Sequence, residues 1–347
     1  MPISKPRLAL TIGDPAGIGP EVIVGAWTNP SVHEWCRPLV VGHPQILRRA
    51  CALVAPAVAV CEIGTPEEAA PSPQLIPCLT ACRPEAADVP AGVIDARGGQ
   101  AAYDALVAAA RLALAGRVDA ITTAPLSKAA LWQAGHHYPG HTELLAELCG
   151  VDDFAMMLYL AHDEQVRGPA GLGVIHVTLH MSLRHALAAL SPAAVLAKIR
   201  LADHTMRPFT TTAPRIGVCA LNPHGGESGL FGDEEETTIA PAVATARAQG
   251  INVQGPYPTD TLMTRARDGE FDAVVAMYHD QGHIALKLLG MHRAVNVTLG
   301  LPIVRTSVAH GTAFDVAWQG RARSTSMVEA IRVACELASR ERMMNAK

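Results

Sequence analysis

Short apolar runs alternate along the chain with longer amphipathic stretches, and this alternation limits the possible folds more than any other feature. The short runs are rich in Val, Ile and Ala and do not alternate in polarity, which is typical of strands buried on both faces. The expected strands are residues 8–12, 38–41, 57–61, 120–123, 155–160, 173–177, 216–220, 273–277 and 295–298. The expected helices are residues 99–115, 142–149, 192–206, 234–249 and 326–339. Repeated strand–helix–strand order predicts an α/β fold with mostly parallel sheets.

The length of 347 residues is sufficient for two domains. We expect residues 131–290 to form one α/β domain. Residues 1–130 together with 291–347 are expected to form the other. Hydrophobic residues make up 49% of the chain but aromatic residues only 4%, so the core must be largely aliphatic. The proline-rich segment 65–90 is expected to be irregular.

Charge and cysteine usage exclude several classes of protein. The formal net charge is −4 and no long basic run is present, which argues against broad nucleic-acid binding but allows a small anionic substrate. The eight cysteines form no CxxC pair, which favours free thiols in a reducing compartment. The N-terminus does not read as a secretory signal, and no window approaches ~18 uninterrupted apolar residues. We therefore expect a cytoplasmic protein without a membrane span.

Three histidines follow predicted strands: His180 ends the stretch GVIHVTLH, His224 ends IGVCALNPH and His279 ends AVVAMYH. Ligands collect at the carboxyl ends of strands in such folds. Imidazoles from three strands could hold a catalytic divalent metal and leave positions open for substrate. Because the chain has 15 histidines, any one of them is more often structural, and the long spacings carry no short metal signature. Pattern alone leaves both interpretations open.

Several cationic and polar residues indicate an anion site. Lys287 lies on the helix after His279, and Asn296 and Arg305 flank the run NVTLGLPIVR. Lys and Arg both bind phosphate or carboxylate, and the apolar context IVRTSV makes an ordinary surface role less expected for Arg305. His141 and Thr142 stand at a predicted helix start, where free N–H groups favour an anion. Solvated surface charges and a plain N-cap threonine are the alternatives.

Two glycine-containing segments are candidates for contact with a nucleotide. LALTIGDPAGIGPEV predicts a strand, a tight turn and a helix, but it fits neither the GxGxxG fingerprint nor the phosphate loop. In HGTAFD, the small residues Gly311 and Thr312 allow close approach of a cofactor. We predict that these two residues bind the nucleotide.

Taken together, TIGDPAGIGPE, TAPLSK, GHTE, LNPHGGE, PTDTL, MYHDQG, NVTLGLPIVRTS and HGTA resemble, in order and spacing, the 4-hydroxythreonine-4-phosphate dehydrogenase family. The resemblance extends from about residue 7 to residue 335. It implies an isocitrate/isopropylmalate dehydrogenase-like fold of two α/β/α domains with an active-site cleft between them. It also implies NAD or NADP as oxidant, a divalent metal (Zn, with Mg, Mn or Co as alternatives) and a homodimer with active sites at the subunit interface.

The resemblance also implies roles for individual residues. The metal ligands are then His180, His224 and His279, and the substrate-binding residues are His141, Thr142, Lys287, Asn296 and Arg305. Lys287 is expected to hold the substrate anion and move a proton, with Asp260 and Asp280 as further catalytic candidates that are polar partners of the metal site. Gly282 is expected to allow a tight turn into the helix that carries Lys287.

The implied reaction is oxidation of the C3 hydroxyl of 4-phosphooxy-L-threonine, followed by decarboxylation to 3-amino-2-oxopropyl phosphate in vitamin B6 biosynthesis. The blocks LHMSLRHAL and GHIALKLLG resemble a branch that acts on D-threonate or D-erythronate 4-phosphate in sugar-acid catabolism. Another branch oxidises aromatic cis-dihydrodiols, but GHTE favours the phosphate-binding branches. Ala309 stands where many members have an acidic residue. A non-catalytic metal- or ligand-binding α/β protein is the alternative outside enzymes.

Overall fold

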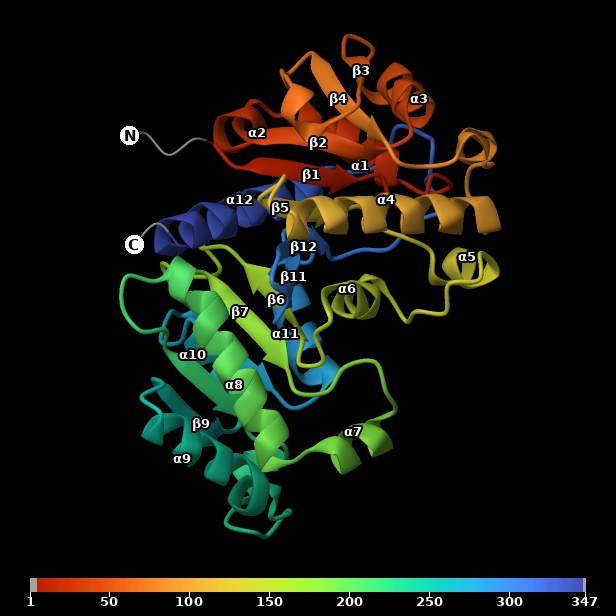
Figure 1. The fold of residues 1–347 in the computed structure, drawn as a ribbon. Coiled ribbons are helices and arrows are strands. Elements are labelled where there is room, and N and C mark those ends of the chain that lie inside the picture. The colour runs from red at the N-terminus through yellow and green to blue at the C-terminus, as the bar shows by residue number, and fades with distance from the viewer. Residues whose placement is uncertain (1–4, 346–347) are drawn as a thin grey trace. The chain divides into compact units, whose positions relative to one another are not determined.

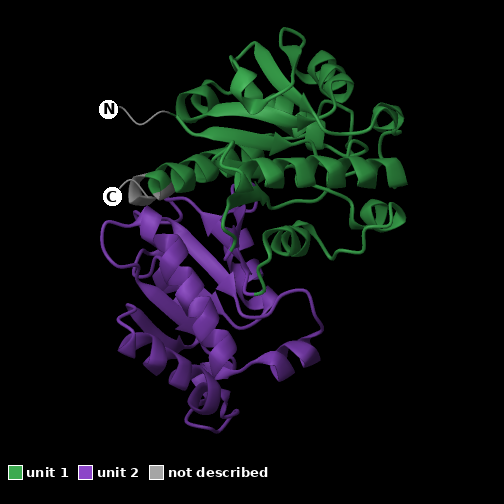
Figure 2. Ribbon diagram, viewed as in Figure 1, with its two compact units in different colours: residues 1–152, 301–347 green, residues 153–300 purple. Residues whose placement is uncertain are grey.

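The structure, a computed structural model, describes residues 5–345 and divides into two compact units. Unit 1 comprises Met1–Asp152 and Leu301–Lys347, and unit 2 comprises Asp153–Gly300 (Figure 2). The predicted divisions are at 130/131 and 290/291, whereas the two units divide at 152/153 and 300/301. Helix α6 (His141–Cys149) belongs to unit 1 because it packs against α4 (Ala96–Leu114).

Unit 1 contains a parallel sheet in the order β3-β4-β2-β1-β5-β12 (Figure 1). Every residue of β5 and β12 is buried. Since successive side chains of a strand point to opposite faces, both faces of these strands must be covered. The strands are β1 (Arg7–Thr11), β2 (Arg37–Gly42), β3 (Ala59–Ile63), β4 (Leu75–Thr80), β5 (Ala120–Thr123) and β12 (Val304–Val308). The other helices are α1 (Gly19–Trp27), α2 (Pro30–Trp35), α3 (Pro44–Val54), α5 (Lys128–Gln133) and α12 (Thr325–Asn345).

Unit 2 contains strands in the order β11-β6-β7-β10-β8-β9. Strand β6 is antiparallel to both of its neighbours, β11 and β7, and the remaining pairs are parallel. The strands are β6 (Ala155–Leu160), β7 (Leu172–His176), β8 (Ile216–Cys219), β9 (Val253–Tyr257), β10 (Ala273–Ala276) and β11 (Val295–Leu299). The helices are α7 (Leu183–Ala189), α8 (Pro192–Met206), α9 (Ala240–Ala248), α10 (Thr259–Arg267) and α11 (His279–Gly290).

The predicted α/β fold with mostly parallel strands is confirmed, but the proline-rich segment 65–90 is not wholly irregular. It contains β4, which lies between β3 and β2. Pro77 is paired with Cys61 of β3, whereas the ladder to β2 begins at Cys78. The missing N–H of Pro77 therefore leaves the β2 ladder intact, which is why a proline is tolerated in this strand.

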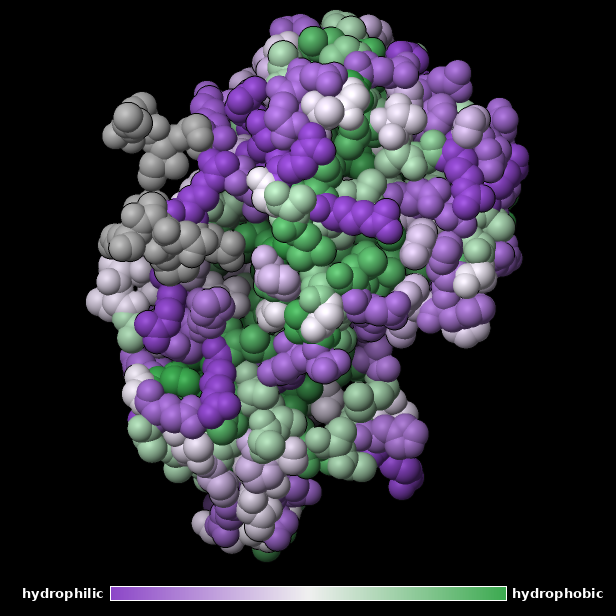
Figure 3. Space-filling view, in the orientation of Figure 1, coloured by the Kyte–Doolittle hydropathy of each residue, from purple (hydrophilic) through white to green (hydrophobic). Residues whose placement is uncertain are grey.

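The surface carries hydrophilic side chains over much of the visible face, with apolar ones between them (Figure 3). No single helix in the described part of the chain is long and apolar enough to cross a membrane. Within the described residues, one pair of helical segments, Leu183–Ala189 and Pro192–Phe209, meets the length and composition test together, but the two segments are bent by 91° relative to each other.

Candidate active site

Two of the predicted metal ligands lie together at the carboxyl ends of neighbouring strands of unit 2. Strands β7 and β10 pair in parallel, and the ladder continues beyond them through Val177 N–H to Ala276 O at 2.8 Å. His180 follows β7, and His279 is the first residue of α11 after β10. Their ring centroids are 6.0 Å apart, and both side chains line a cavity of about 520 Å³.

Asp280 and a second histidine fix the orientation of His279. The Nδ1 atom of His279 lies 2.7 Å from Oδ1 of Asp280. With the proton on Nδ1, Nε2 keeps the lone pair that a metal would bind, and a carboxylate partner of this kind raises ligand basicity. The ring of His279 also stacks on that of His283, with centroids 3.8 Å apart and planes 12° from parallel.

The buried His176 contacts His283, the second ring of this stack. His283 Nδ1 lies 3.1 Å from Nε2 of His176. Burial lowers the pKa of His176 to about 3 and that of His283 to about 4, with neighbouring imidazoles adding to both shifts. Both rings are therefore neutral near pH 7. His176 is buried, as is typical of a structural histidine.

Gly282 does not make the tight turn that the sequence analysis expects. It lies inside α11, and its backbone has no positive φ. A Cβ atom at this position would lie 2.5 Å from Nε2 of His176 and 2.6 Å from Cγ1 of Val174. The glycine is required because α11 passes directly over the His176 ring.

The third predicted ligand, His224, is not brought to the other two within one chain. It lies in the loop after β8, is exposed, and has its ring 6.4 Å from that of Phe231. Between residues 5 and 345 of a single chain, no three His, Cys, Asp or Glu side chains are placed to hold a metal ion together. Asp260 is exposed in the first turn of α10, where its Oδ1 accepts the N–H of Thr261 at 2.9 Å.

A positively charged group forms in unit 1 at the start of α6. Arg305 is 2% exposed in the middle of β12, and its Nη2 donates to Thr123 Oγ1 at 2.7 Å. Burial lowers the pKa of Arg305 to about 9, while Glu143 opposes the shift. His141 and Thr142 are the first residues of α6, whose cap residue Gly140 has no side chain to bind the free N–H groups.

Lys128 belongs to this group although the sequence analysis assigns it no role. The pKa of His141 lies well below its usual value because of burial, followed by the charges of Arg305 and Lys128. Lys128 begins α5, and its Cε lies 3.8 Å from where a Cβ of Gly140 would stand. The residue lies in the block TAPLSK, so its presence in a family motif was the available signal. Three basic side chains thus surround the N-terminus of α6.

Lys287 and Asn296, the other predicted substrate contacts, lie in unit 2. Lys287 is half-buried one helical turn after His283, and its charge contributes to the low pKa of that imidazole. Asn296 lies in β11 opposite Leu158 of β6. Its Oδ1 atom is buried and has no hydrogen-bond partner among the described residues. Such an orphaned acceptor indicates a missing donor.

The predicted nucleotide-binding residues pack against the first strand–helix turn of unit 1. The Ile18 N–H donates to Thr312 O at 3.0 Å, and a Cβ at Gly17 would lie 2.9 Å from Thr312. Gly311 has open space around it. Asp14 in the same turn is fully buried, its Oδ1 accepts the Ala16 N–H at 2.9 Å, and burial raises its pKa to about 6.

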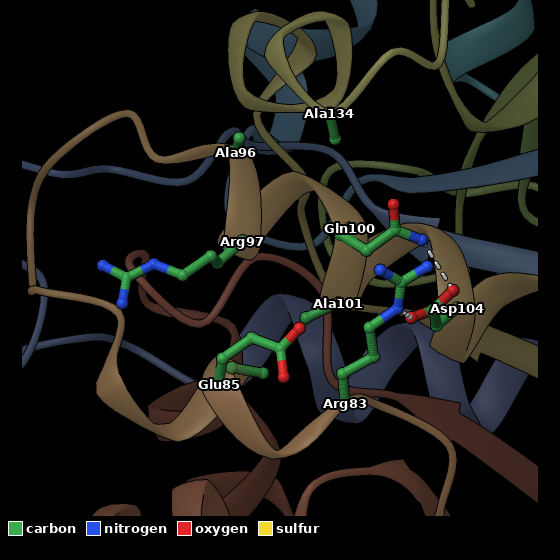
Figure 4. A pocket seen from close by; sticks show the side chains of 9 residues that line it. Arg83, Glu85, Ala96, Arg97, Gln100, Ala101, Asp104 and Ala134 are labelled. Atoms are coloured by element: carbon green, nitrogen blue, oxygen red, sulfur yellow. Dashed lines mark hydrogen bonds and ion pairs between the residues drawn. The ribbon is translucent and has the colours of Figure 1, made fainter.

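A further cavity in unit 1, of about 200 Å³, contains none of the predicted site residues (Figure 4). Arg83 faces Asp104 across it at 3.7 Å, and Gln100 donates to Asp104 at 2.8 Å (Figure 4). Arg97 and Glu85 also line it. Its two arginines are balanced by two carboxylates, so its charges do not single out one kind of ligand.

Comparison with known proteins identifies the class of this chain. A D-threonate 4-phosphate dehydrogenase from Salmonella typhimurium is 48% identical over 95% of this chain and 98% of its own. A 4-hydroxythreonine-4-phosphate dehydrogenase from Trichlorobacter lovleyi is 45% identical over 96% of this chain and 98% of its own. These relatives confirm the prediction of a dehydrogenase.

The family model described as pyridoxal phosphate biosynthetic protein PdxA matches residues 34–334, and the chain belongs to this family. Solved structures agree. A 4-hydroxythreonine-4-phosphate dehydrogenase from Klebsiella pneumoniae has a TM-score of 0.86 at 46% identity, covering 96% of this chain and 100% of that one. A terephthalate 1,2-cis-dihydrodiol dehydrogenase from Burkholderia xenovorans has a TM-score of 0.65 at 32% identity, covering 96% and 98%. The chain is thus a dehydrogenase of this family, and its curated relatives are named 4-hydroxythreonine-4-phosphate dehydrogenase or D-threonate 4-phosphate dehydrogenase.

Proposed function

We propose that the enzyme oxidises the C3 hydroxyl of 4-phosphooxy-L-threonine with NAD or NADP and that the product then loses CO2 to give 3-amino-2-oxopropyl phosphate, a step of vitamin B6 biosynthesis. The basic group at the start of α6 carries the proposal, because it matches the phosphate that both groups of relatives have in their substrate names.

His141, Thr142 and Arg305 bind the phosphate in this proposal. Burying a guanidinium is costly, and the low pKa of Arg305 reflects that cost, which the charge of Glu143 offsets only in part. A dianion at the start of α6 offsets it and also accepts the free N–H groups of the first turn. Lys287 and Asn296 contact the rest of the substrate, and an N–H or O–H donor of the substrate satisfies the buried Oδ1 of Asn296.

Removal of the C3 hydride and the hydroxyl proton leaves a carbonyl one carbon away from the carboxylate. The bond between C1 and C2 of this β-keto acid then breaks, its electrons move toward the C3 oxygen, and C2 finally takes up a proton. We assign that proton to Lys287, an amine held half-buried on α11. The nicotinamide would accept the hydride, and Gly311 and Thr312 are the residues proposed to contact this cofactor.

His180, His224 and His279 would hold a divalent metal, Zn or else Mg, Mn or Co. The donor chemistry fits, since two imidazoles already lie together and Asp280 keeps Nε2 of His279 available. A divalent metal at this position would supply positive charge for the C3 oxygen of the substrate. In this proposal, Asp280 orients the ring of His279. The role of Asp260 as a further polar partner of the metal site remains a prediction.

A homodimer accounts for the separation of His224 from the other two ligands. We propose that His224 of the partner subunit completes the site. Exposed apolar side chains support an interface in this region: Ile284 and Leu288 lie on α11 and Met291 directly follows it, at helical spacing, and Leu288 is 81% exposed. Met181 and Leu183 are also exposed and line the same cavity as His180.

D-Threonate 4-phosphate is the second candidate substrate. It differs from 4-phosphooxy-L-threonine at C2, where a hydroxyl group replaces the amine, and oxidation at C3 would again give a β-keto acid. Three curated relatives named D-threonate 4-phosphate dehydrogenase, which are 46–48% identical to this chain, support this candidate. Aromatic cis-dihydrodiols carry no phosphate for the basic group and are therefore not preferred.

A substrate panel tests the proposal. Purified enzyme with added Zn²⁺, Mg²⁺, Mn²⁺ or Co²⁺ is given 4-phosphooxy-L-threonine, D-threonate 4-phosphate or D-erythronate 4-phosphate, each with NAD and with NADP. We expect an absorbance increase at 340 nm and release of CO2 with one of these acids. Absence of both signals with every combination would contradict the proposal. We also expect the enzyme in the cytoplasm, in agreement with its eight free cysteines.

A further inference from the structure

The loop that carries His224 has an unusual backbone. Six consecutive residues, from His224 to Gly229, have φ between 45° and 90°. Three of them are glycines, which adopt this left-handed region freely, but His224, Glu227 and Ser228 are not. A non-glycine residue persists in this conformation only where the surroundings impose it, and such positions gather at functional sites.

A buried carboxylate imposes the conformation at the entrance of this loop. Glu235 is 4% exposed, and its Oε1 accepts the N–H groups of Leu221 at 2.7 Å and Asn222 at 2.8 Å. Its Oε2 accepts Nδ2 of Asn222 at 3.0 Å, and the same Nδ2 donates to Glu234 Oε2 at 2.6 Å. The residues immediately before the left-handed run are therefore held by their backbone and by a side chain.

Two glycines of the loop leave room for the contact between Asn222 and Glu235. A Cβ at Gly226 would lie 2.7 Å from Oε2 of Glu235, and a Cβ at Gly232 would lie 2.6 Å from Nδ2 of Asn222. Gly226 has φ 80° and Gly232 φ 131°, so a side chain would be strained at either position. The loop thus folds around the Asn222–Glu235 pair instead of lying freely on the surface.

A second side chain, that of Gln281, holds the residue just before those bound by Glu235. Gln281 ties the end of β8 to α11, because its Nε2 donates to Ala220 O at 2.8 Å while its Oε1 accepts the Met277 N–H at 2.7 Å. Glu235 fixes the next two residues along the chain, Leu221 and Asn222, and His224 follows after Pro223. Gln281 thus fixes the position of Ala220 at the start of the loop, and Glu235 fixes the direction of the backbone at the next two residues.

We infer that Glu235 is a positioning residue for His224: together with Asn222, it forms a latch that sets the left-handed turn from which this histidine serves as a metal ligand. The inference rests on the proposed metal site. Nothing in it requires Glu235 to touch the metal or the substrate.

Glu235→Gln tests the latch with almost no change in shape. The Gln oxygen can still accept the two backbone N–H groups, but its amide would face the Asn222 amide, donor against donor. The matched control is Glu236→Gln, which removes the same charge from the adjacent, exposed residue. His224→Ala measures how much of the metal affinity depends on that ligand. Asn222→Ala removes only the side-chain donors and provides a second, milder variant should Glu235→Gln fold poorly.

The main readout is Zn²⁺ affinity of metal-stripped protein by calorimetry, with the visible spectrum of the Co²⁺-loaded protein as a geometric readout. We expect Glu235→Gln to weaken Zn²⁺ binding about 10- to 100-fold and to change the Co²⁺ spectrum, with Asn222→Ala showing a smaller loss and Glu236→Gln none. The Tm of the metal-free variants is expected to stay within a few degrees of that of the unmodified protein.

Three results separate the possible failures. If His224→Ala weakens Zn²⁺ binding but Glu235→Gln and Asn222→Ala do not, the latch is refuted and the metal site stands. If His224→Ala binds Zn²⁺ as the unmodified protein does, the proposed metal site itself is refuted. A large fall in the Tm of metal-free Glu235→Gln without any change in the Co²⁺ spectrum would show that Glu235 serves stability alone, and would also overturn the inference.

Discussion

Nδ1 of His283 lies 3.1 Å from Nε2 of His176, and this contact joins helix α11 to strand β7 beneath the ring of His279. Both imidazoles are neutral because burial lowers their pKa values to about 4 and about 3. One of the two nitrogens must then donate and the other accept. This hydrogen bond fixes the position of the first turn of α11, and therefore of His279, relative to strand β7.

Gly282→Ala should disturb this contact. The new methyl group would stand 2.5 Å from Nε2 of His176, so the helix or the ring must move. Overpacking of this kind costs about 1–3 kcal/mol, which we expect in the free energy of unfolding measured with urea. Gly64→Ala is the control, because a Cβ there meets nothing closer than 3.4 Å. Equal stability of the two variants would contradict the close packing.

His180→Ala should reduce metal content and turnover together. Loss of one charge-stabilising interaction at such a site lowers kcat by about 10²–10³-fold. Bound Zn²⁺ after dialysis and kcat with excess substrate are the measurements. His185→Ala is the control, since His185 is exposed on α7 in the same region of the chain. Undiminished Zn²⁺ binding by the His180 variant would exclude this residue as a ligand.

Lys128→Met should raise KM for the phosphorylated substrate about tenfold and leave kcat nearly unchanged, because the lysine contributes positive charge at the α6 terminus without touching the reacting carbons. Steady-state kinetics with phosphorylated and dephosphorylated substrate distinguish this effect from a general loss of binding. Arg111→Met, which removes an exposed charge from α4, controls for net charge. An unchanged KM would show that Lys128 plays no part in phosphate binding.

Leu288→Lys should dissociate the proposed dimer. This side chain is 81% exposed in the single chain, and a charge at the centre of an apolar interface is strongly unfavourable. Sedimentation velocity is expected to give a monomer for this variant and a dimer for the unmodified protein. Leu114→Lys alters an exposed leucine of α4 and should leave the dimer intact. A monomeric unmodified protein would refute the proposed subunit interface.

Asp14→Asn should change how stability depends on pH. The pKa of Asp14 is raised from 3.8 to about 6 by burial, so between these values the folded state binds more protons than the unfolded state. Asp14 therefore lowers stability progressively as pH rises from 4 to above 6. The difference in unfolding free energy between Asp14→Asn and the unmodified protein should grow by about 2 kcal/mol from pH 4 to pH 7.

Urea unfolding at several pH values measures this difference. Asp95→Asn provides a comparison of opposite sign, since a hydrogen bond from Arg97 lowers the pKa of Asp95. A constant difference between the Asp14 variant and the unmodified protein across the range would show that the carboxyl group titrates normally.

Much of the fold could be predicted because its strands are buried on both faces. The sequence predicts β5, β6 and α8 with the bounds that the structure has, and the Ser191–Pro192 pair marks the start of α8. Strand β9 was missed because Val253–Tyr257 lies at the edge of the sheet, is mostly half-buried and carries Gly255 and Pro256. Its pattern does not differ from that of a loop.

The site was predictable only where a motif coincides with sheet topology. His180 and His279 lie together because β7 and β10 are parallel neighbours, a relation that two strand-end histidines allow one to expect. His224 also follows a strand beside β10, yet its left-handed turn leaves its ring next to Phe231. Backbone conformation of this kind leaves no trace in residue spacing. Lys128 was missed for a similar reason, since only the packing of α6 shows its neighbours.

The two ends of unit 2 meet. Ala155 at the start of β6 pairs with Leu299 at the end of β11, and Gly300, with φ 84°, has Asp153 O only 2.3 Å from where a Cβ would stand. Once this antiparallel pair has formed, the two ends of unit 2 lie next to each other. For the two segments of unit 1, the inserted residues 153–300 then act as a short connection. The entropy lost in joining β5 to β12 then depends on that short connection instead of on the long intervening sequence. Early folding of the inserted unit would thus hasten assembly of the unit that encloses it in sequence.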